Sequence, residues 1–151
     1  MKNFESYFRL FKSSWGILIG IKGEILDFEL LQEEKEIYHI VDDVYLEINI
    51  PLQNKYIHSN NIYIINGIKW VKNKLPRKKI LLRINEIDLN FCNFQIEGLF
   101  FGVANWICKY YNEELPEFES RFDKKDNKYY FMDDSLEKLL YPASTGPDLS
   151  L

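Results

Sequence analysis

The change in hydrophobic period between residues 44 and 89 constrains the fold of this chain more than any other feature. Over 44–50 apolar and polar residues alternate, as in a strand with one buried and one wet face, and Pro51 ends the run. The next apolar residues recur at steps of four, three and four, which predicts a helix that stops before Pro76. A two-residue alternation of side chains returns over 79–89 and predicts a central strand. Such a strand–helix–strand unit needs a sheet with helices packed on it.

Shorter signals precede this unit. The aromatic residues of 4–11 recur at steps of three and four, which favours a helix or turn, although a strand also suits aromatic residues. Isoleucine-rich runs over 15–21 and 24–31 flank Lys22-Gly23, and they predict a hairpin because glycine suits a tight turn. Two further strands are predicted over 37–41 and 44–50, and Asp42-Asp43 forms the turn between them.

The strongest helical pattern of the chain spans 96–111. Gly98 and Gly102 lie four residues apart within it, and we expect this small face to pack closely against the sheet. The later predicted elements are a hairpin of 117–122 and 128–132 and a short helix over 135–140. This order of elements predicts the α+β class: a mostly antiparallel sheet with helices packed on one face.

The length of the chain predicts a single α+β domain over residues 1–141, because 151 residues match the usual size of one domain. Residues 142–151 form a C-terminal tail that we expect to be ordered only if other residues hold it. No apolar run approaches the roughly 20 residues of a membrane span, and the first residues lack the pattern of a signal peptide. We therefore expect a cytoplasmic protein with Cys92 and Cys108 reduced in its core.

Charge argues against a dedicated nucleic-acid binder. The chain has 23 acidic and 19 basic residues and a formal charge of -4, whereas neutralising phosphates needs a net basic surface. One basic group around Pro76 keeps a nucleic-acid accessory domain open as an alternative. Its members are Lys69, Lys72, Lys74, Arg77, Lys78 and Lys79. We expect neither membrane contact nor direct nucleic-acid contact.

Signatures of cofactor and metal chemistry are missing from the sequence. Its seven glycines form neither a P-loop nor a dinucleotide-binding fingerprint. His39 and His58 have no second histidine or cysteine at ligand spacing, and a serine or cysteine nucleophile would need one of them nearby in space. We therefore predict no cofactor, no metal and no catalysis. Clustered carboxylates keep one alternative open, a small hydrolase with a paired carboxylic acid and base.

Acidic and aromatic residues favour a protein-binding surface. Ten tyrosines and eleven phenylalanines are present, and tyrosine brings a large contact area to an interface at little entropic cost. Acidic runs attract basic partners and speed their association. Charge and aromatic grouping predict these partner-binding residues: Asp42, Asp43, Glu113, Glu114, Glu117 and Tyr110.

Residues 79–131 carry a resemblance to a known class of proteins. The motifs are Asn85-Glu86-Ile87-Asp88-Leu89-Asn90, Cys92-Asn93-Phe94-Gln95, Glu97-Gly98-Leu99, Trp106, Phe122-Asp123-Lys124 and Tyr129-Tyr130-Phe131. In these the chain resembles small immunity proteins of bacterial polymorphic toxin systems, including those of contact-dependent growth inhibition. The order of elements is also similar to the ribosomal S5 domain 2-like fold, which is an analogy of pattern.

The resemblance implies binding without catalysis. Immunity proteins of this class are small and cytosolic, and each protects its cell by binding one cognate toxin domain, often across or beside the active site. Many such toxins are nucleases with basic clefts. The expected partner is therefore a cognate nuclease toxin domain, docked by the acidic residues named above with a central tyrosine or tryptophan anchor. The resemblance carries no catalytic residue over to this chain.

Overall fold

A computed structural model describes residues 3–12, 16–27, 36–89 and 94–141 of the chain. The predicted tail 142–151, Cys92 and the end of the predicted run 24–31 lie outside these residues. The described part has the predicted α+β architecture. None of the helices in those ranges is long and apolar enough to cross a membrane.

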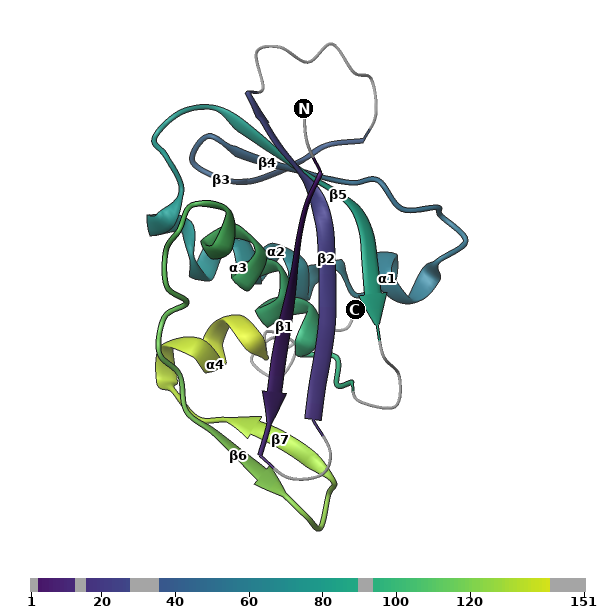
Figure 1. Cartoon of the computed structure of the whole chain (residues 1–151), viewed down its shortest axis with the longest axis vertical. Helices are drawn as coiled ribbons and strands as arrows, with labels where there is room; N and C mark the ends of the chain where they lie inside the picture. Colours follow the sequence, from purple (N-terminus) through teal and green to yellow (C-terminus); the bar gives the residue numbers. More distant parts are fainter. Residues whose placement is uncertain (1–2, 13–15, 28–35, 90–93, 142–151) are drawn as a thin grey trace.

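Five strands form one mixed sheet (Figure 1). They are β1 Phe4–Phe11, β2 Gly16–Asp27, β3 Tyr38–Val41, β4 Val44–Ile48 and β5 Ile80–Leu89. Their order across the sheet is β1-β2-β5-β4-β3, with β4 and β5 parallel and every other neighbouring pair antiparallel. The mostly antiparallel sheet is confirmed, and β5 takes the central place predicted for it.

A helical crossover joins the parallel strands β4 and β5. It consists of α1 Lys55–Ser59, α2 Asn61–Trp70 and the 3-10 helix η2 Lys72–Lys74. Asn54 caps α1, because its side-chain oxygen accepts a hydrogen bond from the backbone N–H of Ile57 at 3.3 Å. Ile64 and Ile68 of α2 are fully buried, one turn apart on the same helix face. The strand–helix–strand unit predicted from the hydrophobic period is confirmed.

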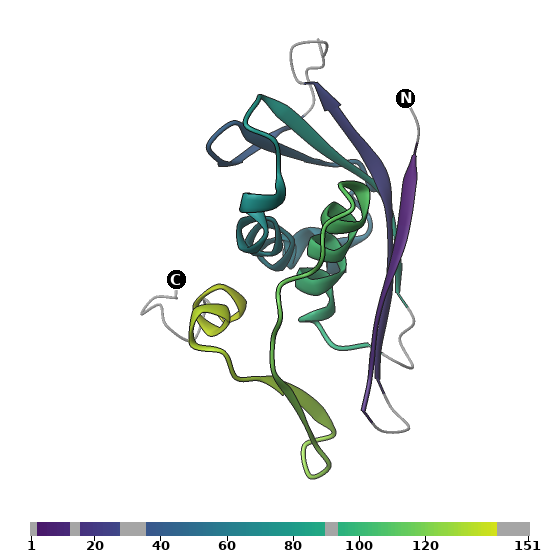
Figure 2. The ribbon, with the colours of Figure 1, turned by 60° about the vertical axis from the view of Figure 1, so that its left-hand side comes forward.

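The helix α3 (Gly98–Tyr110) packs between the sheet and α2 (Figure 2). Every residue from Gly98 to Cys108 is buried. A carbon added at Gly102 would lie 2.9 Å from Cγ2 of Ile19 in β2, so this glycine lets the helix approach the sheet closely. Gly67 of α2 lies against the backbone carbonyl of Phe100 in α3. The predicted packing of the small face of this helix against the sheet is confirmed.

A separate hairpin and a short helix complete the described chain. They are β6 Ser120–Asp123, β7 Lys128–Phe131 and α4 Asp134–Leu140. Gln95 holds the hairpin, because its amide donates to the Tyr129 carbonyl at 2.7 Å and accepts from the Tyr129 N–H at 2.8 Å. Asn66 of α2 donates to the Leu139 carbonyl of α4 at 2.8 Å. The predicted hairpin and short helix are confirmed, and the hairpin forms a sheet of its own.

Two predictions for the N-terminal region are wrong. Residues 4–11 form the strand β1, with Phe8 buried and Tyr7 exposed, because aromatic residues at these positions fit a period of two as well as a helical one. The predicted hairpin around Lys22-Gly23 is the single strand β2. Gly23 lies against the backbone carbonyl of Arg83 at a register shift between β2 and β5. Its missing side chain permits close strand contact there and makes no turn.

The edge strand β1 shares some of its backbone acceptors with α3. Trp106 Nε1 donates to the Phe4 carbonyl at 2.8 Å, and Asn105 Nδ2 donates to the Tyr7 carbonyl at 3.2 Å. Cys108 is buried in the same helix, as predicted, and burial raises the pKa of its thiol.

Candidate functional site

The six predicted partner-binding residues are exposed but do not form one acidic surface. Asp42 and Asp43 make the turn between β3 and β4, and Tyr110 is the last residue of α3. The other three lie in the irregular segment between α3 and β6: Glu113, Glu114 and Glu117. Basic residues of 72–78 lie next to both the turn and the end of α3.

The β3–β4 turn borders a hollow of about 590 Å³ whose lining carries both signs of charge. Its charged residues are Asp42, Asp43, Lys72, Arg77 and Lys78. Nearby, Lys74 pairs with Glu113 at 3.6 Å, and Lys78 pairs with Asp27 at 3.0 Å. Because cations and carboxylates alternate here, their fields largely cancel beyond a few ångströms.

Tyr110 lies on the other side of this basic segment. It borders a second hollow, of about 230 Å³, together with Pro76 and Lys78. Its ring meets the ring of Phe4 edge to face, with the centroids 5.5 Å apart, and the residue remains 39% exposed. Tyr110 is therefore accessible as an anchor, with a cation beside it.

Glu117 belongs to a different surface near the β6–β7 hairpin. It lines a hollow of about 500 Å³ with Glu119 and Asp133 and with the apolar side chains of Phe118 and Met132. Such carboxylates lining one hollow are where the hydrolase alternative would place its acid and base. Within the described ranges, no three His, Cys, Asp or Glu residues are grouped so that they could hold a metal ion.

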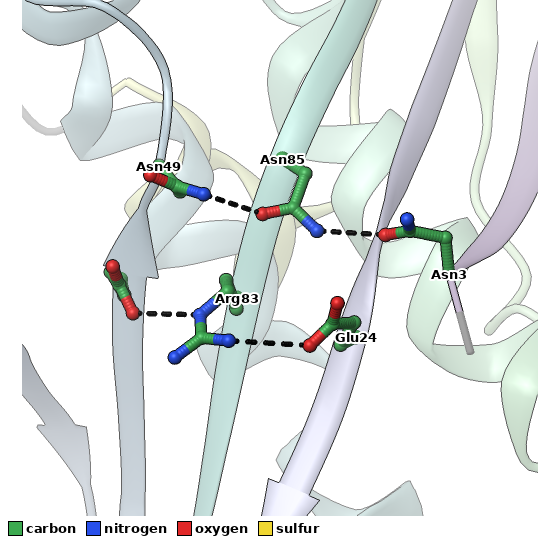
Figure 3. A network of polar contacts seen from close by, with 6 residues as sticks. Asn3, Glu24, Asn49, Arg83 and Asn85 are labelled. Atoms are coloured by element: carbon green, nitrogen blue, oxygen red, sulfur yellow. Dashed lines mark hydrogen bonds and ion pairs between the residues drawn. The ribbon is translucent and has the colours of Figure 1, made fainter. Parts of the chain in front are cut away.

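The sheet face opposite α2 and α3 carries rows of polar side chains, and the described helices lie on the other side (Figure 2). One row crosses three strands. Arg83 of β5 donates to Glu47 of β4 at 2.9 Å and to Glu24 of β2 at 3.3 Å (Figure 3). Glu47 is only 2% exposed, which corrects the prediction that its face of β4 is wet. A guanidinium between two carboxylates links the central strands with charge-assisted hydrogen bonds.

A second row of amides lies beside the first. Asn85 of β5 accepts a hydrogen bond from Asn49 at 2.9 Å and donates one to Asn3 at 2.7 Å (Figure 3). Lys22 of β2 pairs with Glu86 of β5 at 3.9 Å. The polar side chains of this face are thus bound to one another across the strands.

Exposure on this face varies from residue to residue. Leu81 of β5 is fully buried, whereas Tyr7 and Phe11 of β1 are 47% and 43% exposed. Glu86 and Asp88 of β5 are exposed as well, so a partner can reach the face over β1 and over this end of β5.

Tyr7 and Phe11 lie flat on two glycines of β2. Their register partners are Gly20 and Gly16. A carbon added at Gly20 would lie 2.5, 2.8 and 3.0 Å from three consecutive ring atoms of Tyr7, which places the glycine beneath the face of the ring. A carbon added at Gly16 would lie 2.5 and 2.6 Å from two adjacent ring atoms of Phe11. Each ring therefore covers the β2 backbone with one face and directs the other away from the sheet.

Two carboxylates hold the hydroxyl group of Tyr7. It donates to Asp88 Oδ2 at 3.0 Å, and Glu5 Oε2 lies 3.3 Å from the same oxygen. The hydrogen bond to Asp88, with smaller contributions from burial and from Glu5, raises the pKa of Tyr7 to about 12. Glu5, Tyr7 and Asp88 are referred to below as the Tyr7 site.

Sequence patterns do not identify Tyr7 and Arg83 as functional candidates, although one signal for Tyr7 is present. Tyr7 and Phe11 are four residues apart, and so are Gly16 and Gly20. In an antiparallel pair this spacing puts two aromatic–glycine pairs on one face. No comparable local signal exists for Arg83, because its two carboxylate partners come from strands distant in sequence.

Both histidines bind backbone carbonyl groups. His39 Nε2 lies 2.7 Å from the Asp42 carbonyl oxygen, and His58 Nε2 lies 2.9 Å from that of Ile50. These contacts match a structural role for each histidine.

Comparisons of this chain with protein families, curated proteins and solved structures found no match. The similarity to the ribosomal S5 domain 2-like fold therefore stays a prediction.

Proposed function

We propose that this chain is a cytoplasmic immunity protein that binds and neutralises a cognate bacterial toxin domain, a nuclease, without catalysing a reaction. The observation that carries the proposal is the accessible end of the sheet face, where Tyr7 and Phe11 expose flat rings among carboxylates. Exposed aromatic residues surrounded by polar groups are typical of the centres of protein interfaces. The resemblance of residues 79–131 to immunity proteins supports the same class of function.

The charge of this face suits a basic partner. Its carboxylates are Glu5, Glu24, Glu47, Glu86 and Asp88, and its cations are Arg9, Lys22, Arg83 and Lys79, the last over the outward ring of Tyr45. Carboxylates outnumber cations by one on this face, whereas cations outnumber carboxylates by one in the lining of the hollow at the β3–β4 turn. An excess of negative charge attracts the basic cleft of a nuclease and raises the rate of association.

Co-expression tests the function directly. The chain is produced together with the product of the adjacent upstream gene, and the mixture is analysed by size-exclusion chromatography with light scattering. We expect a one-to-one complex, and we expect the neighbouring protein to stop growth when it is produced alone. Two separate proteins and a harmless neighbour would contradict the proposal and favour the hydrolase alternative.

Two matched triple variants test which surface docks the toxin. The first, Glu5→Lys/Glu86→Lys/Asp88→Lys, reverses charge on the sheet face, and the second, Asp42→Lys/Asp43→Lys/Glu117→Lys, does so elsewhere. We expect the first to slow association about tenfold or more at low salt, because steering depends on the local field. The second should have a much smaller effect. The opposite ranking would move the docking surface to the residues predicted from sequence.

A further inference from the structure

We infer that the Tyr7 site binds the guanidinium group of an arginine side chain on the basic partner. The cation stacks on the outward face of the Tyr7 ring and forms hydrogen bonds with the carboxylates of Glu5 and Asp88. This assignment rests on the proposed function, and it names the chemistry that the accessible part of the sheet face recognises.

The geometry of the Tyr7 site suits a planar cation. The ring lies on Gly20, so its free face points away from the sheet, and the residue is 47% exposed. Both carboxylates lie at the hydroxyl end of this ring, within 3.3 Å of the phenolic oxygen. A guanidinium stacked on the ring therefore reaches a carboxylate with its edge N–H groups while its plane contacts the π face.

The β6–β7 hairpin contains a similar arrangement in which the cations are present. The hydroxyl of Tyr130 donates to Asp126 at 2.6 Å. Arg121 Cζ lies 5.4 Å from the centroid of the Tyr130 ring, and Lys128 Nζ lies 5.3 Å from it. The same Arg121 pairs with Asp123 at 3.6 Å. Here an arginine stacks on a tyrosine held by a carboxylate and pairs with a second carboxylate.

The Tyr7 site has the tyrosine and the two carboxylates, and the described part of the chain places no lysine or arginine over its ring. Lys22 of β2 is the register partner of Glu5, and its ammonium group pairs with Glu86 at 3.9 Å. Within the described ranges neither Glu5 nor Asp88 forms an ion pair with a lysine or arginine, so both carboxylates are available to a cation from another molecule.

The same charge disfavours a nucleic acid at this position. Flat aromatic rings also stack on nucleobases, so Tyr7 and Phe11 could serve as a base-stacking platform. However, the carboxylates of Glu5 and Asp88 lie beside the Tyr7 ring, and their negative charge repels phosphate groups. An oligonucleotide is therefore included among the probes below.

The experiment is an NMR titration of the isotope-labelled full chain with N-acetyl-arginine amide. N-acetyl-citrulline amide is the matched control probe, because it has nearly the same shape and no charge. We expect the Tyr7 ring signals to shift and saturate with the arginine probe only. Tyr7→Leu should weaken binding about two- to fivefold, the size of an exposed cation–π contact, whereas Tyr7→Phe should stay within about twofold. Tyr130→Leu, the matched control variant, should leave the affinity unchanged.

Four results would overturn the assignment. Two concern variants: Tyr7→Leu, or the double variant Glu5→Gln/Asp88→Asn, binds the arginine probe with the same affinity as the wild type. Two concern other probes: N-acetyl-lysine amide binds as tightly as the arginine probe, or hexathymidylate causes saturable shifts of the Tyr7 signals. Amide spectra of each variant establish that it is folded.

Probe binding and toxin binding are measured separately, which keeps the two proposals distinguishable. A toxin complex whose dissociation constant is unchanged by Tyr7→Leu would overturn the arginine site and leave the immunity function. Arginine binding at Tyr7 without any toxin complex would overturn the immunity function and leave the site.

Discussion

Replacing Arg83 with methionine measures how strongly the charged row stabilises the central sheet. Methionine keeps a long unbranched side chain and removes the guanidinium that binds Glu47 at 2.9 Å and Glu24 at 3.3 Å. The Glu47 side chain is only 3% exposed, so water poorly replaces the lost hydrogen bond. Removing one partner of a buried ion pair costs about 3–5 kcal/mol, whereas exposed pairs contribute about 1 kcal/mol or less.

The exposure of the two other side chains sets the expected magnitude. Arg83 and Glu24 have side chains 16% and 18% exposed, so some solvent reaches their side of the row. We therefore expect the lower end of the range, a loss of about 3 kcal/mol in the free energy of unfolding for Arg83→Met. In a chain of this size, this loss lowers Tm by about 6–12 °C.

Urea unfolding followed by circular dichroism measures the change. The matched control is Arg9→Met, an exposed arginine of β1 on the same sheet face, and it should change stability by about 0.5 kcal/mol or less. Glu47→Gln and the double variant complete a mutant cycle, with an expected coupling energy of about 2 kcal/mol. Arg83→Met within about 0.5 kcal/mol of the wild type, or a coupling energy near zero, would refute the reasoning.

Three further changes probe other contacts. Gly67→Ala should lower stability in urea by about 1–3 kcal/mol although alanine favours helices, because the added carbon meets the Phe100 carbonyl; a stabilised variant would contradict this close packing. In an ultraviolet titration, Tyr7 should ionise near pH 12 and not near 10, identified by its loss in Tyr7→Phe. Because its folded pKa is raised, its stabilising contribution is complete below pH 10 and is lost as the pH approaches 12; ionisation near pH 10 would argue against the Asp88 hydrogen bond. Trp106→Phe removes the donor to the Phe4 carbonyl and should cost about 1–3 kcal/mol in thermal unfolding; an unchanged Tm would show that this hydrogen bond contributes little.

Local periodicity was sufficient for the middle and the C-terminal part of the fold. The strands β4 and β5 and the helices α2 and α3 are all packed into the core. Burial of a strand face appears in the sequence as a period of two residues, and burial of a helix face as a period of three to four. Gly98 and Gly102 likewise predicted close packing, because a missing side chain is a local property.

Pairing between distant segments decided what periodicity left ambiguous. The aromatic residues of 4–11 fit both a helix and a strand, and only hydrogen bonding to β2 selects the strand. Lys22-Gly23 resembles a turn locally, yet contact with β5 continues β2 through it. Secondary structure here depends on partners far along the chain, which a local pattern does not contain.

The sequence by itself determined the α+β class, the central strand and the excess of acidic over basic residues. The tertiary structure alone decided which charges meet. It sets Asp42 and Asp43 beside cations, encloses Arg83 between carboxylates, and brings Asp88 to the hydroxyl of Tyr7. Salt screens electrostatic interactions over about 10 Å, so which charges act on one another depends on strand order and register rather than on composition.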